Sequence, residues 1–421
     1  MIITVNYRKS SLDIINPNLK IFDGMKFRLS VLAAILCTVQ MSATVPHRAK
    51  FPSVGEYQVL LGDCHVHTMF SDGTVWPATR VDEADYDGLD FIAITDHCDT
   101  PLQRQLKNGI LNPEKVDRNT SYKIASDAAK KYGIIVIHGA ELTRGLAIFP
   151  GHFNALFIED GGRICEAAEK AAAQVKEKGG DTVKQEEAAI MAGLQEARSQ
   201  NAYIQWNHPD WEVQAPNKTV WLPIHTKIYK AGLMDGIEIV NSFIGYDLEA
   251  HQWTVEKNLT ATAGTDCHKP MFQLVDYENK EYRPMTLVFA KERTAEGVKE
   301  ALMNHRSCVF SDDCIYGPEE LIEPLFKAIF EISDVNCTDN RVSFKVRNNS
   351  SVPLELAKGE GSENFVYPRL LRINSGEELT MSVSVRDKSL QKNGRFFDLN
   401  LVVRNFHTDG ETPLKVSYHF E

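Results

Sequence analysis

The chain has 421 residues, of which 43% are hydrophobic and 24% are charged, and its formal net charge is −11. This is the composition of an ordinary globular protein, and the length suits one large domain and one smaller one. The acidic balance argues against stable binding to duplex DNA, which relies on many Lys and Arg contacts with phosphates. The eight cysteines lack the dense spacing of a disulfide scaffold, although Cys308 with Cys314 is one possible pair.

The first element along the chain is a pattern typical of export signals. Residues 25–43, MKFRLSVLAAILCTVQMSA, have a basic start, an apolar stretch of about ten residues and small residues at the exit. The stretch is too short for a membrane span, which takes roughly 20 apolar residues. We expect an upstream extension at 1–24, a signal peptide at 25–43 and export to the periplasm. Cys37 leaves a lipoprotein as an alternative, which Ile35 and Leu36 before it disfavour.

The next part of the chain alternates between strand-like and helix-like segments. Apolar runs such as 89–95 indicate strands buried on both faces, and 119–132 and 248–257 have the pattern of helices. This alternation predicts a βα barrel with its active site at the carboxyl ends of the strands. The expected strands are 58–67, 89–95, 134–142, 152–158, 202–207, 236–241, 260–266 and 284–290.

Residue types that bind metals lie beside these apolar segments. Successive side chains alternate faces in an extended strand, so His65 and His67 point to the same side and can chelate one cation. Asp266 and His268 repeat that spacing. The candidate ligands are six histidines and three acidic residues, namely His65, His67, Asp72, His97, Glu141, His152, His208, Asp266 and His268.

The motifs that carry these residues are DCHVHT, SDG, ITDH, GAEL, GHFN, NHPD and GTDCH. In this order they resemble the motifs of the polymerase and histidinol phosphatase (PHP) superfamily of metal-dependent phosphoesterases. The resemblance implies an α/β fold, a distorted (βα)7 PHP barrel over residues 57–312, with up to three divalent cations. The implied ligand sets are His65, His67, Glu141 and Asp266 for a first metal, Glu141, His152 and His208 for a second, and Asp72, His97 and His268 for a third.

Imidazole and carboxylate ligands without thiolate suit Zn, Mn or Fe, and the choice among these metals stays open. Three divalent cations opposite three carboxylates leave a positive centre, so we expect an anionic substrate. A hydroxide bridging the first two metals, held by Glu141 and Asp266, would attack the phosphorus. Lys269 and Arg144 follow ligand motifs and are candidates for binding the phosphate oxygens, although solvated surface charges are the alternative for both.

Several neighbouring residues have a structural interpretation instead. His138 lies three residues before Glu141, hence on the opposite strand face. Strand alternation also turns Cys64 and Cys267 away from the adjoining ligands, which makes them buried fillers. Asp63, Asp96 and Asp210 lie beside ligand histidines, and we expect them either to orient those histidines or to cap turns.

Two further regions complete the chain. Residues 161–200 predict two helices broken at Gly179 and Gly180, either a solvated hairpin packed on the barrel or a lid. We expect a linker helix at 313–330. At 331–421 apolar residues alternate with period two, which predicts a small antiparallel β-sandwich resembling an immunoglobulin domain. Structural support of the barrel is the favoured role for this domain, while dimerisation and surface attachment stay open, as does the oligomeric state.

The sequence therefore predicts an exported metal-dependent phosphoesterase acting on a small phosphoester. The resemblance to exported members with a trailing β-domain favours a phosphodiesterase, and a phosphomonoesterase or a short-strand nuclease is the alternative. From other classes, a metal-dependent amidohydrolase and a non-catalytic metal- or glycan-binding protein remain open. Glu141 disfavours the amidohydrolase, whose bridging position is usually a carboxylated lysine.

Overall fold

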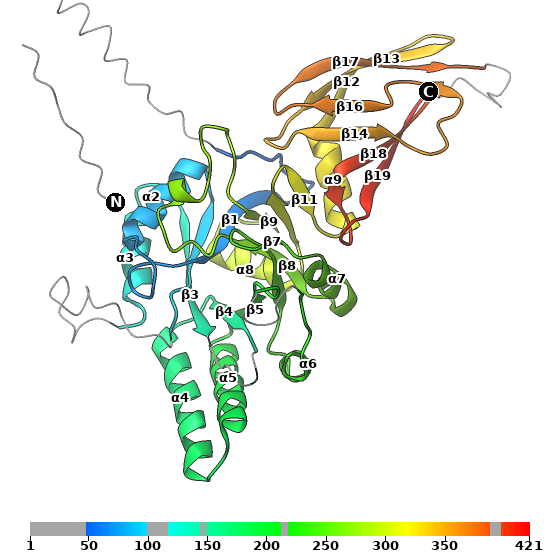
Figure 1. Ribbon diagram of the computed structural model, residues 1–421. Coiled ribbons are helices and arrows are strands. Elements are labelled where there is room, and N and C mark those ends of the chain that lie inside the picture. The colour runs from blue at the N-terminus through cyan, green and yellow to red at the C-terminus, as the bar shows by residue number, and fades with distance from the viewer. Residues whose placement is uncertain (1–47, 99–116, 144–147, 149, 212–217, 388–396) are drawn as a thin grey trace, which may run out of the picture. The chain divides into compact units, whose positions relative to one another are not determined.

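The computed structural model describes residues 48–98, 117–143, 148, 150–211, 218–387 and 397–421 (Figure 1). The expected upstream extension, signal peptide and Cys37 lie outside these residues, as does Arg144. Within the described ranges, no helix combines the length and apolar character needed to cross a bilayer.

Seven strands form the barrel, and each pairs with the next along the chain. The ring closes where the end of β1 meets the segment after β8, because the amide of Asp266 donates to the carbonyl of His65 at 2.8 Å and Val66 bridges Cys267. The predicted distorted seven-stranded barrel is thus confirmed. Its strands are β1 (Gln58–Val66), β2 (Phe91–Ile94), β3 (Ile135–Thr143), β4 (His152–Leu156), β5 (Tyr203–Asn207), β6 (Gly236–Asn241) and β8 (Thr260–Gly264).

Strand β4 departs from the expected parallel arrangement, since it runs antiparallel to both β3 and β5. The connection 144–151 is too short for the crossover of about a dozen residues that a parallel neighbour requires. The reversal places the first residue of β4 at the rim where the other strands end. His152 therefore pairs with Thr143 at the end of β3 and with Asn207 at the end of β5.

Helices lie between the barrel strands along the chain. The expected helices 119–132 and 248–257 are α3 and α7. Helices α4 and α5 lie side by side as a hairpin (Figure 1), capped by the side chains of Asp160 and Asp181. The helices are α2 (Pro77–Asp87), α3 (Thr120–Ala129), α4 (Gly161–Glu177), α5 (Thr182–Ser199), α6 (Pro223–Lys230), α7 (Leu248–Lys257) and α8 (Ala295–Met303), with a short strand β7 (Gly245–Tyr246) and a 3-10 turn at Met271–Gln273.

Three more strands extend the barrel sheet outward from β1, namely β9 (Met285–Ala290), β10 (Ser307–Ser311) and β11 (Cys314–Tyr316), and helix α9 (Glu319–Ile329) follows. Strand β11 pairs in parallel with β18 (Phe397–His407) of the C-terminal domain. The same sheet continues through β14 (Leu354–Lys358), β16 (Leu370–Ile373) and β19 (Pro413–Phe420).

A second, antiparallel sheet completes the C-terminal domain, and the predicted β-sandwich is confirmed. It contains β12 (Phe330–Cys337), β13 (Arg341–Asn348), β15 (Phe365–Val366) and β17 (Glu378–Val385). Along β13 the buried residues Val342, Phe344 and Val346 alternate with more exposed ones, as expected for a strand with one face in a core.

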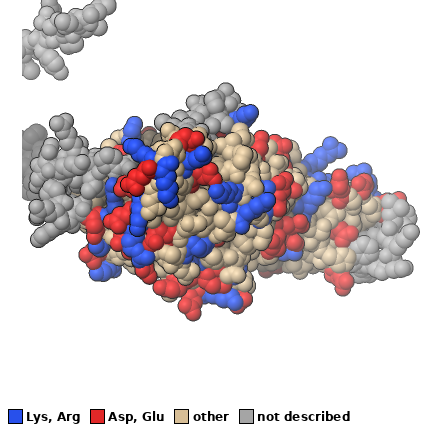
Figure 2. Space-filling view, turned by 90° about the horizontal axis from the view of Figure 1, so that it is seen from below, with Lys and Arg blue, Asp and Glu red and all other residues tan. Residues whose placement is uncertain are grey.

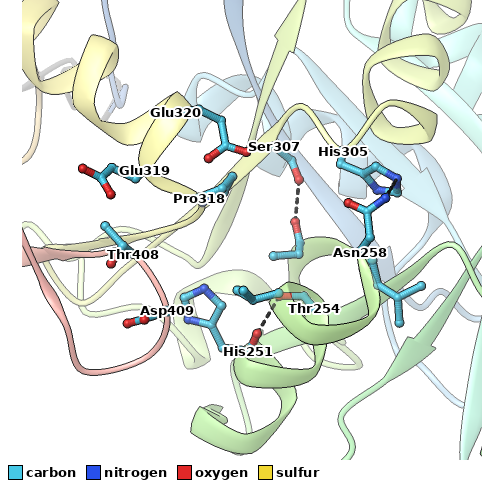
Figure 3. Close-up of a pocket in the computed structure, with 13 residues that line it drawn as sticks. His251, Thr254, Asn258, His305, Ser307, Pro318, Glu319, Glu320, Thr408 and Asp409 are labelled. Atoms are coloured by element: carbon cyan, nitrogen blue, oxygen red, sulfur yellow. Dashed lines mark hydrogen bonds between the residues drawn. The ribbon is translucent and has the colours of Figure 1, made fainter.

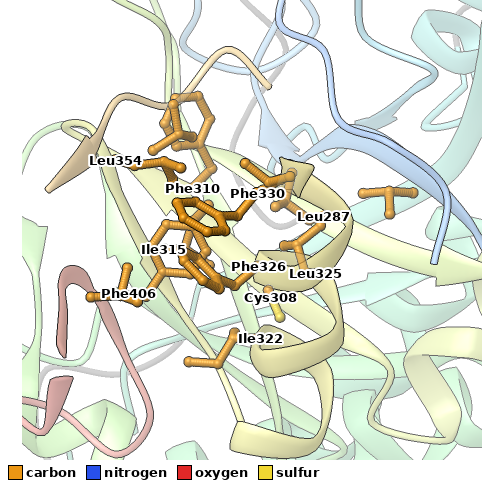
Figure 4. Packing of buried hydrophobic residues seen from close by; sticks show 14 of the residues in the cluster. Leu287, Cys308, Phe310, Ile315, Ile322, Leu325, Phe326, Phe330, Leu354 and Phe406 are labelled. Carbon is orange, nitrogen blue, oxygen red and sulfur yellow. The ribbon is translucent and has the colours of Figure 1, made fainter. Parts of the chain in front are cut away.

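One hydrophobic cluster runs from the barrel extension into the sandwich (Figure 4). Phe310 of β10, Ile315 of β11, Phe326 of α9 and Phe406 of β18 are all at most 1% exposed. The rings of Phe326 and Phe406 meet edge to face at 5.7 Å between centroids. The two domains thus share a core as well as a sheet, which agrees with a supporting role for the sandwich.

The possible Cys308–Cys314 disulfide is absent, because both cysteines have free thiols. In the β10–β11 hairpin Cys314 pairs with Ser311, so the rest of β10 separates it from Cys308. Cys64 lies in a hydrophobic cluster with Phe91, on the side of β1 away from the ligand histidines.

Candidate metal centre

The candidate ligands converge at the carboxyl end of the barrel strands. His65 lies in β1 and His67 just after it, and His97 follows β2. Glu141 belongs to the end of β3, and His208 follows β5. The remaining candidates come from the start of β4 and from loops after β1 and β8, and they are His152, Asp72, Asp266 and His268.

The first group of side chains surrounds one point deep in the rim. The Nε2 atoms of His65 and His67 lie 3.1 Å apart. Oδ1 of Asp266 lies 3.3 Å from the first nitrogen and 3.1 Å from the second. The carboxylate oxygens of Glu141 lie 3.4 Å from His65 and 3.2 Å from His67. All four side chains therefore direct ligand atoms to a common centre.

Two further groups adjoin the first. Glu141 Oε1 lies 3.1 Å from His152 Nδ1 and 3.7 Å from His208 Nε2, so this carboxylate is shared between two groups. On the other side, the oxygens of Asp72 lie 3.1 Å from His268 Nε2, 3.5 Å from His97 Nε2 and 3.7 Å from His67 Nδ1. Asp72 is the most exposed member, with 54% of its side chain accessible.

The donor set fits bound cations. The other nitrogen of His65, Nδ1, lies 3.1 Å from Glu238 and donates to this carboxylate in the neutral ring. The Nε2 lone pair then faces His67 Nε2, which also has a lone pair when His67 Nδ1 donates to Ser71 Oγ, and two such atoms repel unless a proton or a cation lies between them. Among the described residues, His208 Nδ1 is buried without a hydrogen-bond partner, an arrangement that costs about 1–3 kcal/mol when nothing compensates it. Glu141 Oε2 faces nitrogens of ligand histidines, 2.9 Å from His97 Nδ1 and 3.2 Å from His67 Nε2.

The electrostatics of the site point the same way. Burial lowers the pKa of His65, but the carboxylates of Asp266 and Glu238 outweigh burial and raise this pKa well above its usual range. Burial raises the pKa of Glu141, yet the surrounding histidines, His97 foremost, hold it well below its usual range. The carboxylates thus stabilise positive charge placed within the centre.

Carboxylates behind the ligands fix their orientation. Besides His65 Nδ1, Glu238 accepts the amide of His208 at 3.0 Å and the side-chain amide of Asn241 at 3.1 Å. Sequence reasoning missed Glu238, although its signal was present: it is the one charged residue in the buried strand GIEIVN. A carboxylate that orients a ligand histidine is a common feature of metal sites.

Other orienting contacts involve hydroxyl and amide groups that the sequence did not reveal. Ser71 Oγ lies 3.1 Å from His67 Nδ1 and donates to Asp96 at 2.7 Å, so Asp96 orients a ligand histidine through Ser71. Thr143 Oγ1 lies 2.6 Å from His97 Nδ1, and Asn207 donates to Glu141 at 2.9 Å. The role expected for Asp96 therefore has a structural basis.

Backbone contacts hold the loops that carry the ligands. The buried guanidinium of Arg80 donates to the carbonyls of His67 at 2.9 Å and Cys267 at 2.6 Å, and so joins the two motifs that close the barrel. Asp63 accepts the amides of His65 and Thr265. His208 and Asp266 have φ values of 31° and 51°, left-handed conformations that non-glycine residues adopt mainly where the surrounding structure enforces them.

The ligand groups open into a cavity of about 570 Å³. The lining includes Lys269, an exposed residue at the rim, so the structure places this predicted phosphate contact beside the site. Arg144 lies outside the described residues. No described residue of the α4–α5 hairpin lines the cavity, which favours the packed hairpin over a lid. His138 is also absent from this lining and stacks on Tyr122 at 4.2 Å, in line with a structural role.

A second cavity, of about 300 Å³, lies between α7, the start of α9 and the β18–β19 turn (Figure 3). Its histidines are engaged in the fold: His305 Nδ1 lies 2.9 Å from Thr260 Oγ1, and His251 Nδ1 lies 2.9 Å from Tyr246 Oη. None of the candidate ligands lines this cavity. It is therefore separate from the candidate metal centre.

Comparisons with known proteins agree with this geometry. A PHP domain model matches residues 63–188, and an Ig-like domain model matches residues 331–419. A crystal structure from Bacteroides vulgatus ATCC 8482, described as a two-domain protein containing a predicted PHP-like metal-dependent phosphoesterase, is 33% identical; the match covers 89% of this chain and 98% of that chain, with a TM-score of 0.75.

More distant similarity extends to two other structures. A putative metal-dependent phosphoesterase from Bifidobacterium adolescentis ATCC 15703 is 17% identical over 52% of this chain and 89% of its own, with a TM-score of 0.35. An amidohydrolase from Chromobacterium violaceum is 17% identical over 51% of this chain and 89% of its own, with a TM-score of 0.31. No curated protein matches the chain. From the match over nearly the whole length of the B. vulgatus protein, the chain belongs to the PHP family of metal-dependent phosphoesterases and is a hydrolase.

Proposed function

We propose that this protein hydrolyses a small phosphoester, with a phosphodiester preferred over a monoester, at a site that holds three divalent cations. The observation that carries the proposal is the presence of three overlapping ligand groups at one rim: first His65, His67 and Asp266; second His65, Glu141 and His208; and third His67, Asp72, His97 and His268. His152 adjoins the second group through Glu141.

The assignment of ligands to cations follows the sets that the family resemblance implies, in which His65 and His67 are given to the first cation alone. His65, His67, Glu141 and Asp266 would hold the first cation, Glu141, His152 and His208 the second, and Asp72, His97 and His268 the third. Zn, Mn and Fe all suit these nitrogen and oxygen atoms. Bound cations would polarise the phosphoryl group and lower the pKa of water at the site.

The residues of the chain supply position and charge. Glu141 and Asp266 lie between the first and second groups, where the attacking hydroxide would be held. Glu238, Ser71 and Asn207 keep the ligand side chains in place through the contacts described above. Lys269 at the rim would bind a non-bridging phosphate oxygen as the substrate enters.

The cavity and the surface favour a small substrate. A volume of about 570 Å³ falls in the range of small-molecule sites. On the face shown in Figure 2, Lys and Arg side chains are interspersed with Asp and Glu over the described residues. Duplex nucleic acid needs a more continuous basic surface. The preference for a diester is supported by the resemblance to exported PHP proteins with a trailing β-domain.

The decisive experiment combines metal analysis with a phosphoester panel on the purified protein. We expect bound divalent metal, faster turnover of bis-p-nitrophenyl phosphate than of p-nitrophenyl phosphate, and loss of both metal and turnover in Glu141→Gln. Glu331→Gln, an exposed carboxylate on β12, is the matched control. Metal-loaded protein that hydrolyses no phosphoester would refute the function, and faster turnover of the monoester would reverse the proposed preference.

Export rests on the sequence of residues 25–43 alone, and it has its own test. When the full chain is produced in a Gram-negative host, we expect the mature protein in the periplasmic fraction, with an N-terminus directly after Ala43. Retention of residues 25–43 on protein from the cytoplasm would refute export without bearing on the phosphoesterase function.

A further inference from the structure

We propose that the site selects phosphoesters whose alcohol portion carries an apolar aromatic ring, which packs on a wall formed by Trp211, Phe243 and Ile244. We call these three residues the aromatic wall. The inference rests on the proposed phosphoesterase function and adds the chemistry of the group to be released.

The cavity is lined by chemically different side chains. Its lining combines ligand histidines and carboxylates with the three apolar side chains of the aromatic wall. The ring of Trp211 lies 4.7 Å from that of His152 and 5.7 Å from that of His208, and the ring of Phe243 lies 6.1 Å from that of His268. The wall thus adjoins ligands of both the second and the third group. A phosphate at the ligands would place its ester substituent within reach of these rings.

The conformation of its loop keeps the side chain of Phe243 exposed to solvent. It is 58% exposed, although burying such a side chain is favourable. The loop that carries it is held by Asn241, whose Oδ1 accepts the amide of Phe243 at 3.0 Å and whose carbonyl accepts the amide of Ile244 at 3.2 Å. The side-chain amide of the same Asn241 donates to Glu238 at 3.1 Å. Asn241, which contacts the carboxylate that orients His65, therefore also holds the loop that carries Phe243 and Ile244.

Trp211 is fixed in a similar way, because its amide donates to the carbonyl of His208 at 3.1 Å.

Aromatic and aliphatic side chains offer no hydrogen bond to a polyhydroxylated or charged alcohol, and binding such an alcohol there would desolvate its polar groups. An aromatic ring instead gains contact area and ring-to-ring packing. The wall therefore distinguishes substrates by the apolar character of the alcohol rather than by its charge.

The test compares benzyl with ethyl esters, whose leaving alcohols have similar acidity, offered both as monoesters and as methyl diesters. We expect the wild type to prefer the benzyl ester by roughly tenfold in kcat/KM, mainly through KM, since one aromatic contact has about this effect. Phe243→Ala and Trp211→Ala should bring the benzyl-to-ethyl ratio towards one, and Phe243→Leu and Trp211→Phe should restore part of it. Phe272→Ala, a 69% exposed phenylalanine outside the cavity lining, should keep the wild-type ratio.

Binding provides a readout that does not depend on turnover. In calorimetric titrations, benzylphosphonate should bind the wild type more tightly than ethylphosphonate, and the difference should disappear in the two alanine variants. Equal affinities in the wild type, or equal losses for both probes in the variants, would overturn the aromatic wall. Absence of all phosphoester turnover together with preferential benzylphosphonate binding would refute the proposed function and leave the wall intact.

Discussion

Oε1 of Glu238 lies 3.1 Å from Nδ1 of His65, and both side chains are fully buried. The contact fixes the ring so that Nε2 faces the first ligand group. We expect Glu238→Gln to lower metal affinity by roughly 10- to 100-fold, because such supporting partners typically contribute this much. Equilibrium dialysis against a metal buffer measures the change. Glu256→Gln, which removes an exposed carboxylate on α7, is the control; unchanged metal affinity in Glu238→Gln would show that His65 is oriented by packing alone.

The second prediction concerns the contribution of Arg80 to the free energy of unfolding. Its buried guanidinium joins the carbonyls of His67 and Cys267 and pairs with Glu83 at 2.8 Å. Arg80→Met removes these donors from the two buried carbonyls and from the carboxylate of Glu83, so we expect the free energy of unfolding to fall by about 3 kcal/mol. Urea denaturation monitored by circular dichroism measures it. Arg341→Met on the sandwich, where the arginine is exposed, should change stability far less.

The buried His225 predicts a pH dependence of stability. Its Nδ1 accepts the amide of Leu222, its Nε2 donates to the carbonyl of Pro150, and its ring stacks on Trp206 at 3.9 Å. Burial lowers its pKa to about 4. In the unfolded chain the pKa of this histidine is about 6.5. Between pH 6.5 and pH 4 the unfolded chain therefore binds a proton that the folded protein does not bind. The free energy of unfolding consequently falls as the pH falls through this range.

The contribution of His225 should reach roughly 3 kcal/mol at the acidic end of the window. His225→Gln keeps an acceptor and a donor but does not titrate, and its stability should therefore decline less between pH 6.5 and 4, values set by the two pKa limits. Chemical denaturation across this range measures the difference. His419→Gln, a half-exposed histidine, should follow the wild-type profile.

The joint between barrel and sandwich gives a fourth prediction. Phe406 is fully buried and contacts Phe326. Phe406→Ala leaves a cavity in the shared core and should cost about 4 kcal/mol. Because the core belongs to both domains, calorimetry should show the whole molecule melting at a lower temperature rather than the sandwich alone. Leu370→Ala, at a 67% exposed leucine, should leave the transition within a degree or two of the wild type.

Much of this arrangement could be predicted from sequence, because the informative residues are local. His65 and His67 show the strand alternation that aims two imidazoles at one point, and the barrel strands are short apolar runs. The direction of β4 was harder to predict, since an apolar run of residues does not show whether the strand is parallel or antiparallel to its neighbours. The role of Glu238 depends on His65, which lies far away in the sequence and becomes a neighbour only when β6 and β8 pair and β1 closes on them.

The pairing of β11 with β18 could not be predicted for the same reason, because the paired residues Ile315 and Phe406 are 91 positions apart in the sequence. It also bears on how the protein can be divided. A chain shortened after Ile329 would lose β18 and leave the amides and carbonyls of Ile315 and Tyr316 as an open strand beside an uncovered apolar patch. Open edges of this kind recruit strands from other molecules. The catalytic half on its own should therefore self-associate, and the sandwich acts as its built-in protection against aggregation.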